Sequence, residues 1–354
     1  MKISFYSNRI RFDGTFLEKQ GLGGSESALI NLSTCWKQVF PEDTITVFNT
    51  FYRKTEEING VTWKGVVDFK SECKNANWDC FISLRDTEPL LEPYIDSKLK
   101  FFWSQDDTNE IGIQQIAGNQ FLQNRIDSIL VISNHSFNDI KRVISTPLFL
   151  MRNGYRKDWI REGSELTHRE AVAVYSSTPF RGLDVLAEVW PKIYEGCKKY
   201  NIAPELRTYT GMGLYQQADR PSEKQLYEYL SKLPKVTQFG PIPQRVLYDE
   251  LKKARVMLYP NHFLETGAMA VLEALANGVW VVTTDLGALG EQVKDGKNGF
   301  LISGNARSPE YKEKFIEKAI DSLTNDYMPD STGLIFSWQE QVERLRNYIY
   351  NLLE

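Results

Sequence analysis

The first half of the chain alternates short apolar runs with segments whose apolar residues recur at helical spacing. The segment Ser25–Phe40 has this spacing and predicts an amphipathic helix. The apolar runs predict buried strands at Ile3–Tyr6, Thr44–Phe48, Asp79–Ser83, Lys100–Trp103 and Ser128–Ser133. A helix that Ser133 or Asn134 could cap follows the last of these strands. Strands that alternate with helices are typical of a parallel, doubly wound sheet.

The alternation stops in a polar, turn-like stretch, Met151–Leu166, and then starts again. The second half predicts strands at Ala171–Tyr175, Leu206–Thr210, Val236–Phe239, Val256–Tyr259 and Val279–Thr283. It predicts helices at Gly182–Tyr194, Gln244–Ala254, Gly267–Ala276 and Trp338–Leu353. We therefore expect two doubly wound Rossmann-like α/β domains, residues 1–155 and 156–335, that face a cleft, the default ligand site. Residues 336–354 should form a helix that packs back toward the first domain.

The composition narrows the class of protein. A chain of 354 residues is long enough for two hydrophobic cores, and 42% hydrophobic and 25% charged residues are ordinary for a globular protein. The formal net charge of -4 argues against a general nucleic-acid binder. The four cysteines form no CxxC pair, which favours a reducing compartment over a disulfide framework or a zinc site. No secretory signal or membrane-spanning run is visible, so we expect a cytoplasmic protein; peripheral membrane contact is compatible with this sequence.

Two glutamates eight residues apart, Glu265 and Glu273, carry the most specific signal. They follow the predicted strand Val256–Tyr259, with Glu265 at the mouth of a predicted helix and Glu273 along it. Ligands bind outside the carboxyl ends of strands in such sheets, and a helix N-terminus there attracts phosphate. Because carboxylates accept hydrogen bonds from hydroxyls, the combination indicates a nucleotide sugar. The helix dipole alone also favours acids in a first turn, so a purely structural explanation stands beside this one.

The run from Tyr259 to Ile302 resembles the donor-binding half of the retaining GT-B glycosyltransferases of family GT4, whose E-x7-E motif falls on Glu265 and Glu273. The resemblance implies that Glu265 contacts the donor sugar and Glu273 the ribose, while backbone amides between them hold the diphosphate. Those amides would come from Gly267, Ala268 and Met269. The family's usual glycine three residues after the first glutamate is Ala268 here. The resemblance also implies retention at the anomeric carbon and no bound metal or other cofactor.

The turn after the predicted strand Ala171–Tyr175 reads Ser-Ser-Thr-Pro-Phe-Arg-Gly and ends with Arg181. A hydroxyl-rich turn with a solvated arginine would explain it. Alternatively, Arg181 binds the diphosphate beside Ser177, because a guanidinium fork matches phosphate oxygens. The family usually has an arginine and a lysine here. Arg181 takes the lysine position and Tyr175 the arginine position, so one expected cation is missing, and Ser176, Ser177 or backbone donors would partly replace it.

A glycine-rich loop, Gly21–Glu26, leads into the first predicted helix. It does not match G-x-G-x-x-G, and Ser25 could simply cap the helix. The family resemblance favours a functional interpretation, in which the backbone of Gly23 and Gly24 faces the donor phosphates.

Many members of the family have a histidine in the region of the polar loop 104–107, where this chain has Gln105, Asp106 and Asp107. A plain polar loop is one interpretation, and Asp106 facing the donor or acceptor is another. A metal-binding acid pair is a third.

The three histidines of the chain are far apart in the sequence, so we expect no metal site. His135 stands at a predicted helix start, where capping is the expected role. His168 lies in a polar linker and should be solvated. His262 precedes Glu265 by three residues and could contact the donor.

These interpretations together predict a retaining glycosyltransferase of polysaccharide biosynthesis. It would move a sugar from a nucleotide-diphosphate sugar to a hydroxyl of a glycan, lipid-linked or other acceptor. The alternatives are a nucleotide-sugar epimerase, a phosphorylase and a non-catalytic nucleotide-binding scaffold. A phosphorylase would need a cofactor lysine signature that the sequence does not show.

Overall fold

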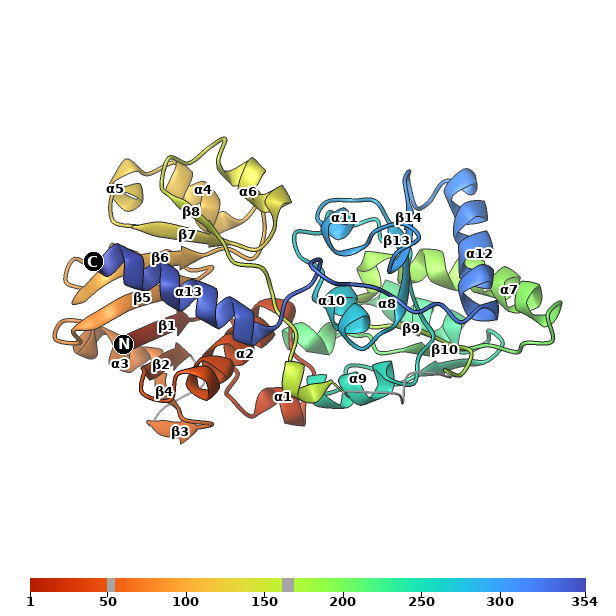
Figure 1. The fold of residues 1–354 in the computed structure, drawn as a ribbon, viewed down its shortest axis with the longest axis horizontal. Helices are drawn as coiled ribbons and strands as arrows, with labels where there is room; N and C mark the ends of the chain where they lie inside the picture. The colour runs from red at the N-terminus through yellow and green to blue at the C-terminus, as the bar shows by residue number, and fades with distance from the viewer. Residues whose placement is uncertain (50–54, 161–168) are drawn as a thin grey trace. The chain divides into compact units, whose positions relative to one another are not determined.

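The computed structural model describes residues 1–49, 55–160 and 169–354 (Figure 1). His168 and the last residues of the predicted boundary, up to Leu166, lie outside the described residues. The contacts within the chain form two compact units. Unit 1 contains Met1–Leu17, Gly23–Lys157 and Phe336–Glu354, and unit 2 contains Glu18–Leu22 and Asp158–Ile335.

Unit 1 is built on an eight-stranded sheet in the order β3-β4-β2-β1-β5-β6-β7-β8. Its strands are β1 (Lys2–Ser7), β2 (Thr44–Asn49), β3 (Glu56–Ile58), β4 (Val61–Gly65), β5 (Trp78–Leu84), β6 (Ser97–Trp103), β7 (Ser128–Val131) and β8 (Leu148–Leu150). All neighbours pair in parallel except the edge pair β3 and β4. The α-helices that begin in this unit are α1 (Phe16–Lys19), α2 (Gly24–Val39), α3 (Val66–Glu72), α4 (Ile111–Ala117), α5 (Gln120–Gln123), α6 (Asn134–Ile140) and α13 (Trp338–Leu353).

The C-terminal helix α13 belongs to unit 1 and packs against α2. It starts with a capping box, in which Ser337 accepts from the Glu340 backbone and Glu340 accepts from the Ser337 backbone. The Arg346 guanidinium donates from Nε to Asp43 at 2.8 Å, and Asp43 also accepts from the Trp36 indole of α2 at 2.9 Å. Burial acts to raise the pKa of Asp43, but these donors outweigh it and the pKa is lowered.

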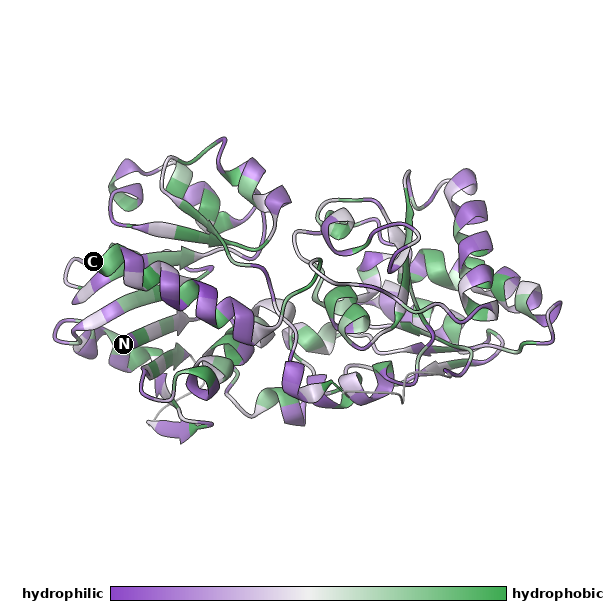
Figure 2. Ribbon diagram, viewed as in Figure 1, coloured by the Kyte–Doolittle hydropathy of each residue, from purple (hydrophilic) through white to green (hydrophobic). Residues whose placement is uncertain are grey.

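Unit 2 is built on a six-stranded, wholly parallel sheet in the order β11-β10-β9-β12-β13-β14. Its strands are β9 (Val172–Tyr175), β10 (Glu205–Thr208), β11 (Val236–Gln238), β12 (Val256–Tyr259), β13 (Trp280–Thr284) and β14 (Gly299–Ile302). Its α-helices are α7 (Leu183–Lys198), α8 (Pro221–Leu230), α9 (Gln244–Leu251), α10 (Met269–Ala276), α11 (Leu289–Gln292) and α12 (Pro309–Thr324). The central strands β9 and β12 are buried along their whole length, as expected for a parallel sheet covered on both faces. Figure 2 shows α12 and α13 largely hydrophilic on the side in view, which suits helices that cover a core with their apolar faces.

The prediction of two doubly wound, Rossmann-like domains is confirmed by these two sheets. The sequence pattern missed β3, β4, β8 and β14, which are short and lie at or next to the sheet edges. Three helix ends were also wrong, and one of them is that of the helix predicted to end at Ala254, which ends at Leu251. The helix predicted to start at Gly267 starts at Met269, and the helix predicted to end at Tyr194 continues to Lys198.

No helix among the described residues combines the length and the apolar character needed to cross a membrane.

Candidate functional site

The strand order of unit 2 reverses between β9 and β12. The chain moves outward from β9 through β10 to β11, and then returns to β12 on the other side of β9. The loops at the carboxyl ends of these two strands therefore diverge, which creates the place where doubly wound sheets bind ligands. The residues that meet there come from the loop 176–182 after β9 and the loop 260–268 after β12.

The loop after β9 carries three hydroxyl side chains, and the Tyr175 side chain at the end of β9 supports it. Ser176, Ser177 and Thr178 are all buried, and the buried Tyr175 hydroxyl donates to the Thr178 carbonyl at 2.7 Å. Tyr175, which occupies the position of the family's arginine, therefore supports the loop and brings no charge to it. The loop ends at Gly182, whose φ is +105°. A Cβ there would lie 2.1 Å from the Pro260 carbonyl oxygen, so only glycine allows this close approach of the two loops.

Arg181 and Glu265 meet across these loops, 84 residues apart in sequence. The Arg181 Nη1 donates to both carboxylate oxygens, at 2.8 and 3.0 Å, and the Tyr259 hydroxyl donates to Oε1 at 2.6 Å. Ser177 Oγ lies 3.3 Å from the Tyr259 hydroxyl. Burial acts to lower the pKa of Arg181, but the Glu265 charge outweighs it and the pKa is raised. Burial and the Glu265 charge raise the pKa of Tyr259, so this phenol stays a hydrogen-bond donor.

The Arg181 guanidinium also packs over the Phe263 ring, with Cζ 4.6 Å from the ring centroid. Its Nε is buried and has no hydrogen-bond partner among the described residues. The same is true of Ser176 Oγ and Thr178 Oγ1. The loop therefore holds one buried N–H donor and two buried hydroxyls that have no hydrogen-bond partner among the described residues.

The backbone around Glu265 is fixed from its other side by the loop after β13. The Ala288 amide donates to the Glu265 carbonyl at 2.7 Å. Gly287 has a φ of +63°, and a Cβ there would lie 2.2 Å from the same carbonyl oxygen. Loops that follow three neighbouring strands of the sheet, β9, β12 and β13, thus fix the position of Glu265.

Helix α10 starts immediately after the loop 260–268. Gly267 and Ala268 precede the helix, and Ala268 is its N-cap with φ -67° and ψ 96°. The N-cap side chain makes no capping hydrogen bond, so the first N–H groups of the helix have no side-chain acceptor from it. These N–H groups and the positive end of the helix dipole can receive an anion.

Glu273 lies one turn into α10 and is only 5% exposed. Its Oε1 accepts a hydrogen bond from the Gln244 amide, at the start of α9. Burial raises the pKa of Glu273 to about 7, and the Gln244 hydrogen bond opposes that rise. The sequence interpretation missed Gln244, because nothing local connects a glutamine at one helix start with a glutamate 29 residues later.

His262 is bound at its Nε2 by neighbours outside the Arg181–Glu265 pair. That atom lies 3.1 Å from Asp184 Oδ1 and 3.1 Å from Arg307 Nη2. Arg307 also pairs with Asp184 at 2.9 Å. A role for His262 in binding the donor stays a prediction.

Gly23 and Gly24 lie in unit 1, at the start of α2. Gly23 is the N-cap, with extended backbone, and Gly24 is the first helical residue. The expectation that Ser25 caps this helix is wrong. Ser25 is inside the helix, and its Oγ accepts from Arg85 at 3.3 Å.

Asp106 also lies in unit 1 and forms an ion pair with Arg85. Arg85 follows β5, next to β1, where the strand order of unit 1 reverses. Its Nε donates to the fully buried Glu110 at 3.0 Å. Burial raises the pKa of Glu110 and of Glu26, although the Arg85 charge lowers both. The sequence interpretation named Asp106 but missed its neighbours Arg85, Glu110 and Glu26, because the four residues come from three separate segments.

Arg85 adopts a left-handed backbone, with a φ of +60°. This conformation costs a non-glycine residue about 1–3 kcal/mol and is concentrated at functional sites.

The other residues of the polar loop 104–107 form hydrogen bonds within unit 1. Gln105 Oε1 accepts from the Asn153 amide at 3.4 Å. Asp107 Oδ1 accepts from the Asn109 backbone at 2.7 Å. Asp107, His135 and Asp139 each place one ligand atom within 4.8 Å of the others. His135 does not cap α6, because Ser133 is the N-cap and accepts from the Ser136 amide.

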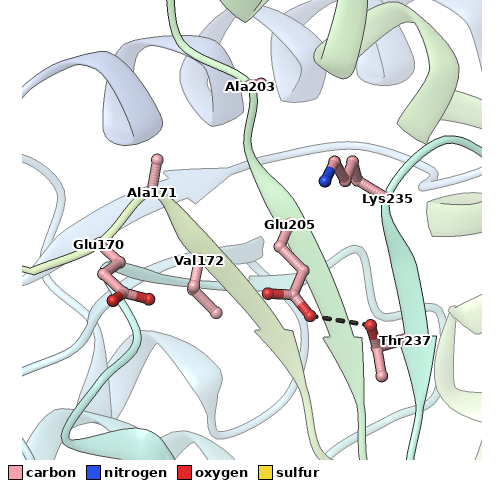
Figure 3. A pocket seen from close by; sticks show the side chains of 7 residues that line it. All are labelled: Glu170, Ala171, Val172, Ala203, Glu205, Lys235 and Thr237. Atoms are coloured by element: carbon pink, nitrogen blue, oxygen red, sulfur yellow. Dashed lines mark hydrogen bonds between the residues drawn. The ribbon is translucent and has the colours of Figure 1, made fainter.

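A separate cavity of about 350 Å³ lies at the opposite, amino-terminal edge of the sheet in unit 2. Figure 3 shows its lining at the starts of β9, β10 and β11, where Thr237 donates to Glu205 at 2.8 Å. None of the predicted site residues lines this cavity.

Comparisons with known proteins found a family match that lies within unit 2. Residues 178–330 match the family described as Glycosyl transferases group 1. This range contains Arg181, Gln244, Glu265 and Glu273. No curated protein sequence matches the chain.

Among solved structures, the chain is similar to sucrose-phosphate synthase from Thermosynechococcus elongatus, with a TM-score of 0.70, 12% identity and 99% of each chain covered. It is similar to AviGT4, a glycosyltransferase involved in avilamycin A biosynthesis, with a TM-score of 0.67, 16% identity, and 99% of this chain and 98% of that chain covered. It is also similar to HepE of Anabaena in complex with UDP and glucose, with a TM-score of 0.64, 13% identity, and 99% of this chain and 100% of that chain covered. At these identities the likeness shows the fold, which is the predicted GT-B fold.

Proposed function

We propose that this protein is a retaining glycosyltransferase of the GT4 type. It transfers a sugar from a nucleotide-diphosphate sugar to a hydroxyl of a glycan, lipid-linked or other acceptor. The observation that carries the proposal is the Arg181–Glu265–Tyr259 network at the point in unit 2 where the strand order reverses. It lies within the range that matches Glycosyl transferases group 1.

The diphosphate fits the cationic and hydroxyl-bearing side of this site. Arg181 keeps a buried Nε for a phosphate oxygen while its Nη1 stays on Glu265. Ser176 and Thr178 supply hydroxyls, and the N-terminus of α10 at Ala268 and Met269 supplies backbone N–H groups. Ser177, between these two hydroxyl-bearing residues, lies 3.3 Å from the Tyr259 hydroxyl at the end of β12. This set replaces the second cation of the family pattern with neutral donors.

Glu265 orients the sugar in this proposal, and Glu273 accepts hydrogen bonds from the ribose. Cleavage of the bond from the anomeric carbon to phosphate leaves positive charge on the sugar and negative charge on the departing diphosphate. Arg181 and the α10 amides stabilise the departing charge, and such preorganised donors are worth about 2.7–4 kcal/mol each. The acceptor hydroxyl attacks on the same face while a leaving phosphate oxygen takes its proton. No covalent intermediate is needed, and retention follows.

The neighbouring structures suggest where to begin the search for the donor. HepE of Anabaena has been crystallised with UDP-glucose, and a lipopolysaccharide outer core galactosyltransferase is also similar in fold. We propose polysaccharide-type acceptors and a cytoplasmic location for the reaction, with the enzyme working on nucleotide sugars without a resident metal.

The test is a nucleotide screen followed by a turnover assay. Isothermal titration with UDP, GDP, ADP and dTDP, without and with added magnesium, should identify one nucleotide that binds without the metal. The matching sugar nucleotides are then tested for hydrolysis and transfer, and product stereochemistry is read by NMR. Failure to bind any nucleotide would refute the proposal, and an inverted anomeric centre would refute retention. Binding without turnover under every acceptor would instead indicate a scaffold.

A further inference from the structure

We propose that Gln244 is a positioning residue for nucleotide recognition, which orients the Glu273 carboxylate toward the ribose. The inference rests on the proposed function, because it assumes that Glu273 contacts the nucleotide. It assigns a role to a residue outside the E-x7-E motif and adds α9 to the donor site.

The two side chains meet in a buried environment. Gln244 is the first residue of α9, whose N-cap is Pro243, and its side chain donates from Nε2 to Glu273 Oε1. Gln244 is 8% exposed and Glu273 is 5% exposed. Helices α9 and α10 pack against each other, so both backbones are fixed. A buried hydrogen bond between fixed helices restricts the carboxylate to one orientation and leaves Oε2 for a ligand hydroxyl.

Within the part of the chain that the structure describes, no opposing charge contributes to the pKa of Glu273. Apart from Glu273 itself, α10 has no titratable residue, and the adjacent strand β13 has none. The titratable residues of α9 are Arg245, Tyr248, Asp249 and Glu250, and none of them contributes to the pKa shift of Glu273. Burial raises that pKa to about 7, and the Gln244 amide is the group that lowers it.

This arrangement differs from that of the other glutamate of the motif. Glu265 is held by the Arg181 guanidinium and a phenol, whereas Glu273 is held by a neutral amide. A neutral donor orients the carboxylate without balancing its charge, and it leaves Oε2 to accept hydrogen bonds from the ribose hydroxyls.

The experiment compares two substitutions of Gln244 that should respond to pH in opposite directions. Gln244→Met keeps the size of the side chain but removes the donor. Gln244→Glu adds a second carboxyl beside Glu273. The probe is UDP and its 2′,3′-dideoxy counterpart, or the same pair for whichever base the wild type binds. Titration calorimetry at pH 6, 7, 8 and 9 gives the affinity ratio of the two, which measures recognition of the ribose hydroxyls.

We expect the wild type to favour the ribose form about tenfold, the discrimination that roughly 1.4 kcal/mol of hydroxyl recognition gives. In Gln244→Met the ratio should fall severalfold at pH 7 and recover only in part toward pH 9, because Glu273 then loses its proton but no donor holds its carboxylate in one orientation. In Gln244→Glu the ratio should fall further as the pH rises, because two carboxylates then repel each other. Gln120→Met, an exposed glutamine on α5 of unit 1, is the matched control and should leave the ratio unchanged.

The outcomes separate the inference from the proposed function. A wild type that binds no nucleotide refutes the proposed function itself. A wild type that discriminates, with both Gln244 variants keeping the same ratio at every pH, refutes the positioning role alone. A parallel loss of affinity for both probes, with no change in their ratio, also refutes it, because that result indicates structural damage only. Thermal melts of both variants show that the protein measured is folded.

Discussion

Each unit places an arginine where its strand order reverses, Arg181 after β9 in unit 2 and Arg85 after β5 in unit 1, yet the two arginines have different surroundings. Arg181 of unit 2 meets one carboxylate, a phenol and a loop of buried hydroxyls, some without partners among the described residues. Arg85 of unit 1 is bonded to Asp106, Glu110 and Ser25, with Glu26 also nearby. The difference shows that an arginine at the reversal of the strand order can have unpaired donors beside it or be surrounded by its own counter-charges.

Unit 2 therefore has unused donors, and unit 1 has surplus carboxylates. An arginine that is already paired with several acids is a poor phosphate site, since a phosphate would have to displace them. A carboxylate-rich site suits hydroxyl or amine donors instead. Substitutions in the two units can test this contrast.

The largest effect should follow from Glu265→Gln. The amide keeps the shape of the side chain but removes the charge that balances Arg181 and one of the acceptors for the sugar. We expect kcat/KM for the sugar nucleotide to fall at least about 100-fold. Steady-state release of the nucleotide measures it, with Glu195→Gln on the exposed side of α7 as the matched control. A change of less than fivefold would show that the pair is structural.

Arg85→Met should affect stability more than nucleotide binding. The substitution leaves the buried Glu110 carboxylate without its counter-charge, and removal of one partner of a buried pair costs about 3 kcal/mol or more. Urea unfolding measures the loss of free energy of unfolding, and the double substitution Arg85→Met with Glu110→Gln should recover much of it. Unchanged nucleotide affinity in Arg85→Met is expected. A loss of affinity equal to that of Arg181→Met would remove the contrast between the units.

Glu273→Gln should stabilise the protein in a pH-dependent way while weakening nucleotide binding. Because the pKa of Glu273 is raised from 4.5 to about 7, the folded state binds the proton more tightly than the unfolded state, and stability is lost as the pH rises through this range. The uncharged amide avoids that loss. We expect a gain of about 3 kcal/mol in the free energy of unfolding at pH 8 and less than about 1 kcal/mol at pH 5, measured by urea unfolding at the two pH values. A gain that is equal at both pH values would show that the pKa of Glu273 is not raised in the folded protein.

The smallest effect should come from Tyr259→Phe. It removes the 2.6 Å hydrogen bond to Glu265 but keeps the buried ring. The loss of one hydrogen bond to a charged group should cost about 1.5 kcal/mol, or roughly tenfold in kcat/KM. Tyr311→Phe in α12 is the matched control, because its hydroxyl bonds Thr284 and not Glu265. Equal effects of the two substitutions would show that Tyr259 acts only through packing.

Much of the fold could be predicted because its signal is local. Strands such as β9 and β12 are fully buried, so they appear as continuous apolar runs, and the turns after them contain Gly182 and the residues before α10. The edge strand β3 could not be predicted in this way. Its sequence is Glu-Glu-Ile, and it becomes a strand by pairing with β4.

The candidate site was predictable residue by residue but not as a network. Arg181, Ser177 and Glu265 were expected to act on the same ligand, and the structure brings them together around Tyr259. Tyr259 itself was passed over because a tyrosine at the end of a strand resembles any core residue. Asp106 was expected near the donor or acceptor, and the structure shows it paired with Arg85, a partner that the sequence does not indicate.

The sequence alone determined the alternation of strands and helices, the glycines at the close approaches, and the kinds of side chain available at each carboxyl-end loop. These properties follow from hydrophobic periodicity and backbone sterics, which act over a few residues. Only the tertiary structure decided which side chains meet, namely Arg181 with Glu265, Gln244 with Glu273, and Arg85 with Asp106 and Glu110. Such pairs depend on the order of the strands and on the packing of helices, and they join segments 21 to 84 residues apart. The sequence thus determines which charged side chains each site contains. The fold determines how these side chains are paired, and the pairing decides what chemistry the site can perform.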